Sequence, residues 1–221
     1  MAFGSRKQAA DKRALARQLV GGLWDEMGQV QFDFLLSRGL KPGNVMLDVG
    51  CGALRGGVHF IRYLAAGNYY GVDRAQGMLD VGLVELREAG LEDRAPVLRC
   101  DETFDFAALG AQFDVALAQS VFTHINFNAI HRCLVRVSEV LKPGGVFYAT
   151  FLENRGNPHD LSPLTFSQPD IADTVTFPDK NPYHYPLRFF EDLIVGLPLR
   201  LDYIGEWGSL RGQSMLAFTR V

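Results

Sequence analysis

The sequence contains few cysteines and no long apolar run, and both features limit what the chain can be. Its 221 residues include three widely spaced cysteines, Cys51, Cys100 and Cys133. This number and spacing fit neither a disulfide framework nor a zinc-binding pattern, so we expect free thiols in a reducing compartment. No run of about 18 apolar residues is present to span a membrane, and the N-terminus lacks the apolar core of a signal peptide. We therefore predict a cytoplasmic protein without a membrane partner.

The chain also lacks an excess of positive charge. Its net charge is −3 and its pI is about 5.9. Such a chain has no overall basic field to attract nucleic acid, so we predict no nucleic-acid partner. The basic residues of a predicted helix over residues 8–20, Lys12, Arg13 and Arg17, are interpreted as a solvated face rather than a nucleic-acid site.

Strand and helix patterns alternate through most of the chain. Predicted strands are separated by predicted helices and short turns, which favours a doubly wound, parallel α/β sheet. The strands are expected at 45–49, 69–73, 96–100, 113–118, 146–151, 199–207 and 214–220, and the helices at 8–20, 23–38, 55–66, 75–89, 126–141 and 187–195. Glycines at 67 and 90 are expected to end two of the helices. The last two strands are expected to form an antiparallel hairpin.

A glycine-rich turn after the first strand is the most informative motif. Val45 to Val49 is apolar except for Asp48, and Gly50-Cys51-Gly52 follows. Glycines at these places permit a tight turn with positive φ and leave space for a ligand. The third glycine, Gly56, stands one place later than in the dinucleotide fingerprint. Leu-Asp-Val-Gly-Cys-Gly resembles motif I of the class I S-adenosylmethionine (SAM)-dependent methyltransferases, especially their small-molecule type 11/12 group.

The resemblance implies a Rossmann-like, seven-stranded, mostly parallel sheet and SAM as the cofactor. Asp48 then faces the cationic methionine end of SAM. Asp73 ends the second strand, where an acidic residue accepts hydrogen bonds from ribose hydroxyls. Asp101 corresponds to the residue that contacts adenine, with Glu102 and Asp105 as alternatives. The full predicted cofactor set is Asp48, Gly50, Cys51, Gly52, Asp73, Arg74, Asp101, Glu102 and Gln119.

Two histidines are candidates for a general base, because an imidazole titrates near pH 6.5. His124 follows the fourth strand, although a structural role as the cap of the next helix is the favoured interpretation. His184 lies between Tyr183 and Tyr185, and this triplet either lines an acceptor pocket or packs in the core. The predicted substrate-binding residues are Trp24, Phe122, Tyr183 and Tyr185. No metal site is predicted.

Two segments lie outside the part that the resemblance covers. Residues 1–40 are expected to form a helical cap over the sheet, with core packing at the sheet edge as the alternative. Residues 41–221 are expected to form the SAM-binding domain. Within it, residues 152–186 contain five prolines and no clear period. Such a long irregular segment is typical of a functional loop, and we predict an acceptor-site insert.

These observations predict a SAM-dependent methyltransferase acting on a small-molecule or glycan acceptor by in-line displacement, with oxygen as one candidate for the methylated atom. A catalytically inactive SAM-binding partner protein is an alternative, because no convincing base is evident. A nucleotide-dependent oxidoreductase is a further alternative that the displaced glycine disfavours. The sequence is compatible with a monomer or a homodimer.

Overall fold

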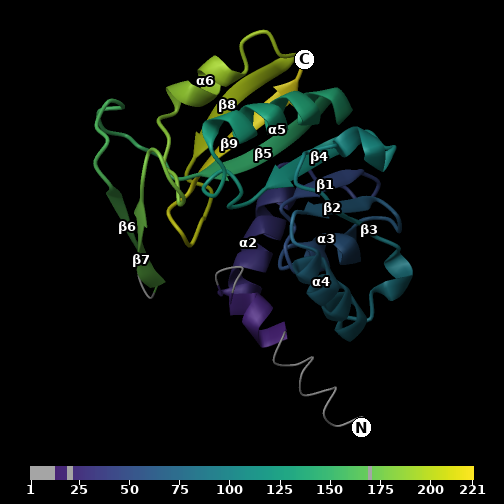
Figure 1. Ribbon diagram of the computed structural model, residues 1–221. Helices are drawn as coiled ribbons and strands as arrows, with labels where there is room; N and C mark the ends of the chain where they lie inside the picture. Colours follow the sequence, from purple (N-terminus) through teal and green to yellow (C-terminus); the bar gives the residue numbers. More distant parts are fainter. Residues whose placement is uncertain (1–12, 19–21, 169–170) are drawn as a thin grey trace. The chain divides into compact units, whose positions relative to one another are not determined.

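The computed structural model describes residues 13–18, 22–168 and 171–221, which form two compact units, 1–102 and 103–221. Figure 1 shows the elements of both units. The first unit contains a helix over residues 13–18 and then, in order, α2 (Trp24–Ser37), β1 (Met46–Val49), α3 (Gly57–Tyr63), β2 (Tyr69–Asp73), α4 (Gln76–Glu88), the short 3-10 helix η1 (Glu92–Arg94) and β3 (Val97–Cys100).

The second unit is built around an antiparallel and parallel set of strands. Its elements are η2 (Phe106–Leu109), β4 (Phe113–Ala118), α5 (Phe127–Val140), β5 (Leu141–Phe151), β6 (Leu164–Gln168), β7 (Ile171–Thr176), α6 (Arg188–Leu193), β8 (Leu199–Gly205) and β9 (Ser214–Arg220). Strand β4 runs parallel to β5, whereas β9 is antiparallel to both β5 and β8. The predicted closing hairpin is therefore confirmed.

The strand order is β3-β2-β1 in the first unit, all parallel, and β4-β5-β9-β8 in the second. These strands make up the seven-stranded, mostly parallel sheet that the sequence predicts. All four residues of β1 are buried, Asp48 included. A strand buried on both faces explains why its apolar run is nearly continuous rather than alternating.

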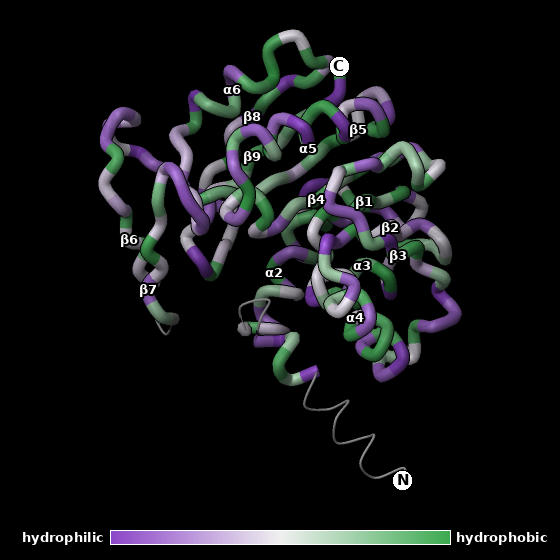
Figure 2. The backbone as a smooth tube through the Cα atoms, viewed as in Figure 1, coloured by the Kyte–Doolittle hydropathy of each residue, from purple (hydrophilic) through white to green (hydrophobic). Residues whose placement is uncertain are grey.

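The helices bury one face each. Helix α5 buries Ile130, Cys133, Leu134 and Val137, at the spacing of one helical stripe. Figure 2 shows the same alternation of hydrophilic and hydrophobic segments along α4 and α5. The α5 helix starts at an Asn126 cap, whose side chain accepts a hydrogen bond from the amide of Ala129 at 3.0 Å.

Several predicted boundaries need correction. Helix α3 ends at Tyr63 with an extended Leu64, so Gly67 lies beyond the helix and does not cap it, whereas Gly90 directly follows the cap residue of α4. Strand β5 begins at Leu141, but its pairing with β4 skips from Leu141 to Val146. Residues 142–145, which lie between the predicted helix at 126–141 and the predicted strand at 146–151, thus form an irregularity within β5.

The two predictions outside the sheet are partly resolved. Within the helix predicted over residues 8–20, residues 13–18 are helical. Residues 8–12 and 19–20 lie outside the described residues. The segment 152–186 is not wholly irregular, because β6 and β7 pair as an antiparallel hairpin in a sheet of their own (Figure 1). The period-two signal of these two strands was too short to detect among the prolines.

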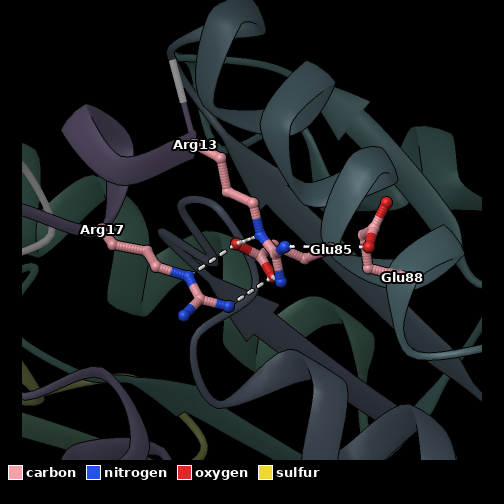
Figure 3. A network of polar contacts seen from close by, with 4 residues as sticks. All are labelled: Arg13, Arg17, Glu85 and Glu88. Carbon is pink, nitrogen blue, oxygen red and sulfur yellow. Dashed lines mark hydrogen bonds and ion pairs between the residues drawn. The ribbon is translucent and has the colours of Figure 1, made fainter. Parts of the chain in front are cut away.

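The predicted solvated arginine face is wrong for the two arginines that the structure describes. Arg13 and Arg17 each donate two hydrogen bonds to the carboxylate of Glu85 on α4, at 2.6–2.8 Å (Figure 3). Glu85 is 3% exposed, and its side chain lies on the buried face of α4. These ion pairs attach the helix over residues 13–18 to α4.

Candidate functional site

The turn after β1 has the conformation that its glycines predict. Gly50 and Gly52 have φ values of 70° and 54°, in the region that favours glycine. The amides of Gly50 and Cys51 both donate to the carbonyl of Val72 on β2, at 2.7 and 3.1 Å. The turn is therefore fixed against the neighbouring strand at the carboxyl end of β1.

Asp73 connects this turn to the end of β2. Its Oδ2 accepts a hydrogen bond from the amide of Gly52 at 2.9 Å, and its Oδ1 accepts one from the amide of Ala75 at 2.8 Å. Each carboxylate oxygen has two acceptor sites, so these contacts use only part of the capacity of Asp73. The sequence predicted the position of Asp73 but not its contact with the glycine turn.

Asp48 lies buried in β1, with 5% of its surface exposed. Its Oδ2 accepts a hydrogen bond of 2.6 Å from the hydroxyl of Tyr69. Burial raises the pKa of Asp48 to about 7, an effect that the Tyr69 hydrogen bond and the Arg55 charge oppose and the Asp73 charge reinforces. Asp48 is therefore close to half-ionised near neutral pH.

The other predicted cofactor residues of the first unit differ in how deeply they are buried. The Cys51 side chain is buried, and burial raises the pKa of its thiol well above the usual range. Asp101 is half-buried and its amide donates to the carbonyl of Asp73 at 3.0 Å, which places it beside the end of β2. Arg74 and Glu102 are exposed.

The segment before α2 also contacts the glycine-rich region of the first unit. Arg55, which follows the turn, is 7% exposed and donates from Nη1 to the carbonyl of Gly22 at 3.1 Å. Trp24, a predicted substrate-binding residue, is half-buried, and the Arg17 guanidinium lies 4.5 Å from its ring centroid. This cation–π contact already covers one face of the indole.

In the second unit, Gln119 belongs to a buried polar network at the end of β4. Its Nε2 donates to Ser120 Oγ at 2.7 Å, and Gln213 Nε2 donates to the same oxygen at 2.8 Å. Thr150 on β5 accepts from the amide of Ser120 and donates to Gln213 Oε1, both at 2.7 Å. Trp207 donates to the carbonyl of Gln213 at 3.0 Å.

Ser120 has a φ of 60°, which is unusual for a residue with a side chain. Such a conformation costs about 1–2 kcal/mol unless the surroundings hold it, and the network supplies the restraint. Ser120, Thr150 and Gln213 were not predicted. Ser120 follows β4, Thr150 lies on β5 and Gln213 lies in the turn before β9, so no local pattern in the sequence brings them together.

Two predicted residues after β4 have different surroundings from those expected. Phe122 is fully buried, with its ring 6.0 Å from those of Phe147 and Phe190. It is a core residue, without exposed surface for a substrate. His124 is exposed and does not cap α5, because Asn126 does; instead its Nδ1 lies 2.8 Å from Asn181 Oδ1.

The predicted triplet Tyr183-His184-Tyr185 is held between two strand ends of the second unit. The amide of Tyr183 donates to the carbonyl of Thr123 at 2.7 Å, in the segment after β4. The amide of Tyr185 donates to the carbonyl of Leu152 at 2.9 Å, after β5, and the Tyr185 hydroxyl donates to the carbonyl of Ile125 at 2.8 Å. The end of the insert is therefore fixed at the carboxyl ends of β4 and β5.

Within this triplet the tyrosines and the histidine have different partners. The rings of Tyr183 and Tyr185 stack with centroids 5.7 Å apart. His184 is 2% exposed and its Nδ1 lies 2.8 Å from Thr176 Oγ1 on β7. Within the described residues, its buried Nε2 has no hydrogen-bond partner. Burial lowers the pKa of His184, so the imidazole is neutral at pH 7.

Neither a metal-binding cluster nor a membrane-spanning helix is present among the residues that the structure describes. Among them, no three His, Cys, Asp or Glu side chains gather in a way that suits a metal ion. None of their helices has the length and apolar character needed to cross a membrane.

Residues 47–147 match a family model whose description is a methyltransferase domain. The matched segment begins in β1 and ends in β5, so it includes the glycine turn, Asp73, Asp101 and Gln119.

Solved structures of SAM-dependent methyltransferases have the same fold. One from Clostridium acetobutylicum is 14% identical, with 99% of each chain covered and a TM-score of 0.66. Magnesium protoporphyrin IX methyltransferase from Synechocystis, with bound SAM, is 14% identical at a TM-score of 0.63, covering 89% of this chain and 79% of that one. An amino pentose methyltransferase from Micromonospora echinaspora, also with SAM, is 14% identical at a TM-score of 0.62, covering 100% and 97%.

Proposed function

We propose that this chain is a class I SAM-dependent methyltransferase, with SAM as its cofactor, and that it transfers a methyl group to a small-molecule or glycan acceptor. The observation that carries the acceptor proposal is the position of the aromatic insert, whose Tyr183 and Tyr185 are hydrogen-bonded at the carboxyl ends of β4 and β5. Ligands of open α/β sheets bind at the carboxyl ends of strands. The match of residues 47–147 to a methyltransferase-domain model supports this function over the oxidoreductase alternative.

The first unit contains donors and acceptors that fit SAM. We assign the turn amides around Gly50 and Gly52 to its methionine and ribose parts, and Asp48 to its cationic end. Asp73 retains acceptor capacity for the ribose diol beside its two backbone contacts. Asp101, at the neighbouring strand end, is the candidate for the adenine, with Cys51, Arg74 and Glu102 around it.

The second unit supplies the candidate acceptor and proton-transfer groups. Gln119, fixed by Ser120, is assigned to the methionine part of SAM. When bound, SAM supplies a methyl group that is displaced in line from its sulfonium. A hydroxyl acceptor also loses a proton, and His124 is the better placed candidate to receive it, because it is exposed and Asn181 orients its Nδ1. His184 is buried, which favours a structural role.

An acceptor of this kind agrees with the structural relatives. One relative is an amino pentose methyltransferase and another is a magnesium protoporphyrin IX methyltransferase, so enzymes with this fold include small-molecule methyltransferases. The stacked tyrosines offer flat apolar surface with polar edges, which suits a sugar or an aromatic hydroxyl compound. We propose residues 152–186 as the acceptor-site insert and residues 1–40 as a helical cap.

The test combines cofactor binding with methyl transfer. We expect SAM and S-adenosylhomocysteine, but not NADH or ATP, to raise the melting temperature of the full chain. A ligand at about 100 times its Kd stabilises the folded state by about 2.7 kcal/mol. Asp73→Ala should abolish this protection, whereas Asp93→Ala, which changes an exposed carboxylate on η1, should leave it unchanged.

Transfer is then measured with SAM carrying a labelled methyl group and a panel of amino sugars, hydroxylated aromatics, nucleic acids and proteins. Label in a sugar or aromatic hydroxyl compound supports the proposal. Label only in nucleic acid or protein contradicts it. Protection by NADH or ATP without protection by SAM contradicts the cofactor assignment.

A further inference from the structure

The side chain of Tyr69, a buried residue on β2, extends to the carboxylate of Asp48 on the neighbouring strand β1. In the parallel pairing of β1 with β2, Met46 is opposite Tyr69 and Asp48 is opposite Gly71. Tyr69 therefore lies two residues before the position opposite Asp48, on the same face of the sheet, and its side chain passes over Gly71 to reach Asp48. Its hydroxyl donates to Asp48 Oδ2 at 2.6 Å, a short distance typical of a charge-assisted bond.

Two glycines leave the space that this tyrosine occupies. A Cβ at Gly71 would lie 3.1 Å from Tyr69 Cε1 and 2.9 Å from Cys51 Sγ. A Cβ at Gly57, the first residue of α3, would lie 2.6 Å from the Tyr69 hydroxyl. Residues with side chains at either position would displace the ring or the hydroxyl. The chain thus admits an aromatic side chain that reaches Asp48 from the neighbouring strand.

Tyr69 is 2% exposed, so its hydroxyl would be costly to bury without an acceptor. Asp48 supplies that acceptor. In return, the hydrogen bond favours the ionised carboxylate over the neutral acid. Its other neighbours are Arg55, which acts in the same direction, and Asp73 and buried Cys51, which do not favour a negative charge on Asp48.

We propose that Tyr69 is a positioning residue for cofactor recognition, holding Asp48 as the ionised and oriented carboxylate that receives the cationic methionine end of SAM. This inference rests on the proposed role of Asp48. It assigns to Tyr69 a function in affinity and in its pH dependence, beyond filling the space between β2 and α3.

The proposal predicts a pH-dependent loss of affinity in Tyr69→Phe, which removes only the hydroxyl. The pKa of Asp48 is about 7, so half of the wild-type carboxylates are ionised at pH 7. If the lost hydrogen bond raises that pKa by roughly one unit, about one tenth remain ionised and SAM binds about five-fold more weakly. Near pH 9 both forms are almost fully ionised, and the difference should nearly vanish.

The measurement is calorimetric titration of the full chain with SAM between pH 6 and 9. The ratio of the variant Kd to the wild-type Kd is taken at each pH, because the titration of the SAM amino group then cancels. Tyr63→Phe is the matched control, since it also removes one hydroxyl of the first unit, which donates to the carbonyl of Leu40 at 3.2 Å. Its ratio should stay near one throughout.

A Tyr69→Phe ratio that falls toward one with rising pH supports the proposal. A ratio that is constant across the range, or equal to one at pH 7, overturns it, because a purely structural role has no such pH dependence. Asp48→Asn provides a second test if Tyr69→Phe does not fold. The ratio of its SAM Kd to the wild-type Kd should increase as pH rises from 6 to 8.5. If wild type binds no SAM at any pH, the proposed function fails instead.

Discussion

Substitution of Glu85 tests how the helix over residues 13–18 is attached to α4. The carboxylate of Glu85 is 3% exposed and accepts four hydrogen bonds from Arg13 and Arg17 (Figure 3). The substitution Glu85→Gln keeps the shape of the side chain and removes its charge. It leaves two guanidinium groups facing an amide that can accept at only one of its two polar atoms.

The expected loss is smaller than for a fully buried ion pair. Removing one partner of such a pair costs about 3–5 kcal/mol. The arginine side chains are 30% and 33% exposed, so water can replace part of what they lose. We therefore expect Glu85→Gln to lower the free energy of unfolding by roughly 2–3 kcal/mol, or the melting temperature by about 4–12 °C for a chain of this size.

The control is Glu88→Gln on the same helix. Glu88 is 57% exposed and lies 3.9 Å from Arg13, so its loss should change stability by less than about 0.5 kcal/mol. Urea unfolding gives the free energies. Tryptic cleavage after Arg17 reports whether the helix over residues 13–18 has left α4, and it should become faster only in Glu85→Gln. Equal behaviour of the two variants would refute the reasoning.

The pH dependence gives an independent check. Burial raises the pKa of Glu85, but the hydrogen bonds from Arg17 and Arg13 outweigh it and hold the pKa below its usual value of 4.5. A carboxyl with a lowered folded pKa stabilises the protein above its unfolded pKa, and this contribution is lost as pH falls through the folded pKa. The difference between wild type and Glu85→Gln should therefore be complete above about pH 5.5 and should shrink below pH 4.5.

Two further predictions concern buried polar groups of the second unit. Because burial lowers the pKa of His184, the wild type should lose stability as pH falls below 6.5; His184→Asn should weaken this dependence between pH 7.5 and 5.5 in urea unfolding, and exposed His131→Asn should not. Thr150→Val removes the acceptor of the Ser120 amide and the donor to Gln213 Oε1 and should cost roughly 1–3 kcal/mol, whereas Thr150→Ser, which keeps the hydroxyl, should cost less; equal losses in the two variants would contradict the network.

The parts of the fold that the sequence predicted have local causes. Strand β2 has the predicted bounds because Tyr69 to Asp73 is a short apolar run between a glycine turn and a helix start. The hairpin of β6 and β7 was missed because its two short strands lie in a segment with five prolines, in which no alternating pattern stands out.

The same distinction applies to the candidate site. Asp48, Gly50, Gly52 and Asp73 were found because glycines and carboxylates at strand ends are a local pattern. Their partners are not local: Tyr69 is 21 residues from Asp48, and Gln213 is 93 residues from Ser120. From the sequence alone, a tyrosine at the start of a buried strand cannot be distinguished from an ordinary core residue. The pairing of β1 with β2 places the carboxylate of Asp48 within reach of the Tyr69 hydroxyl. The glycines at 57 and 71 leave the space that the Tyr69 side chain occupies. The residues expected to contact SAM can therefore be predicted from the sequence. The residues that set the charge and orientation of these contact residues depend on the register between strands.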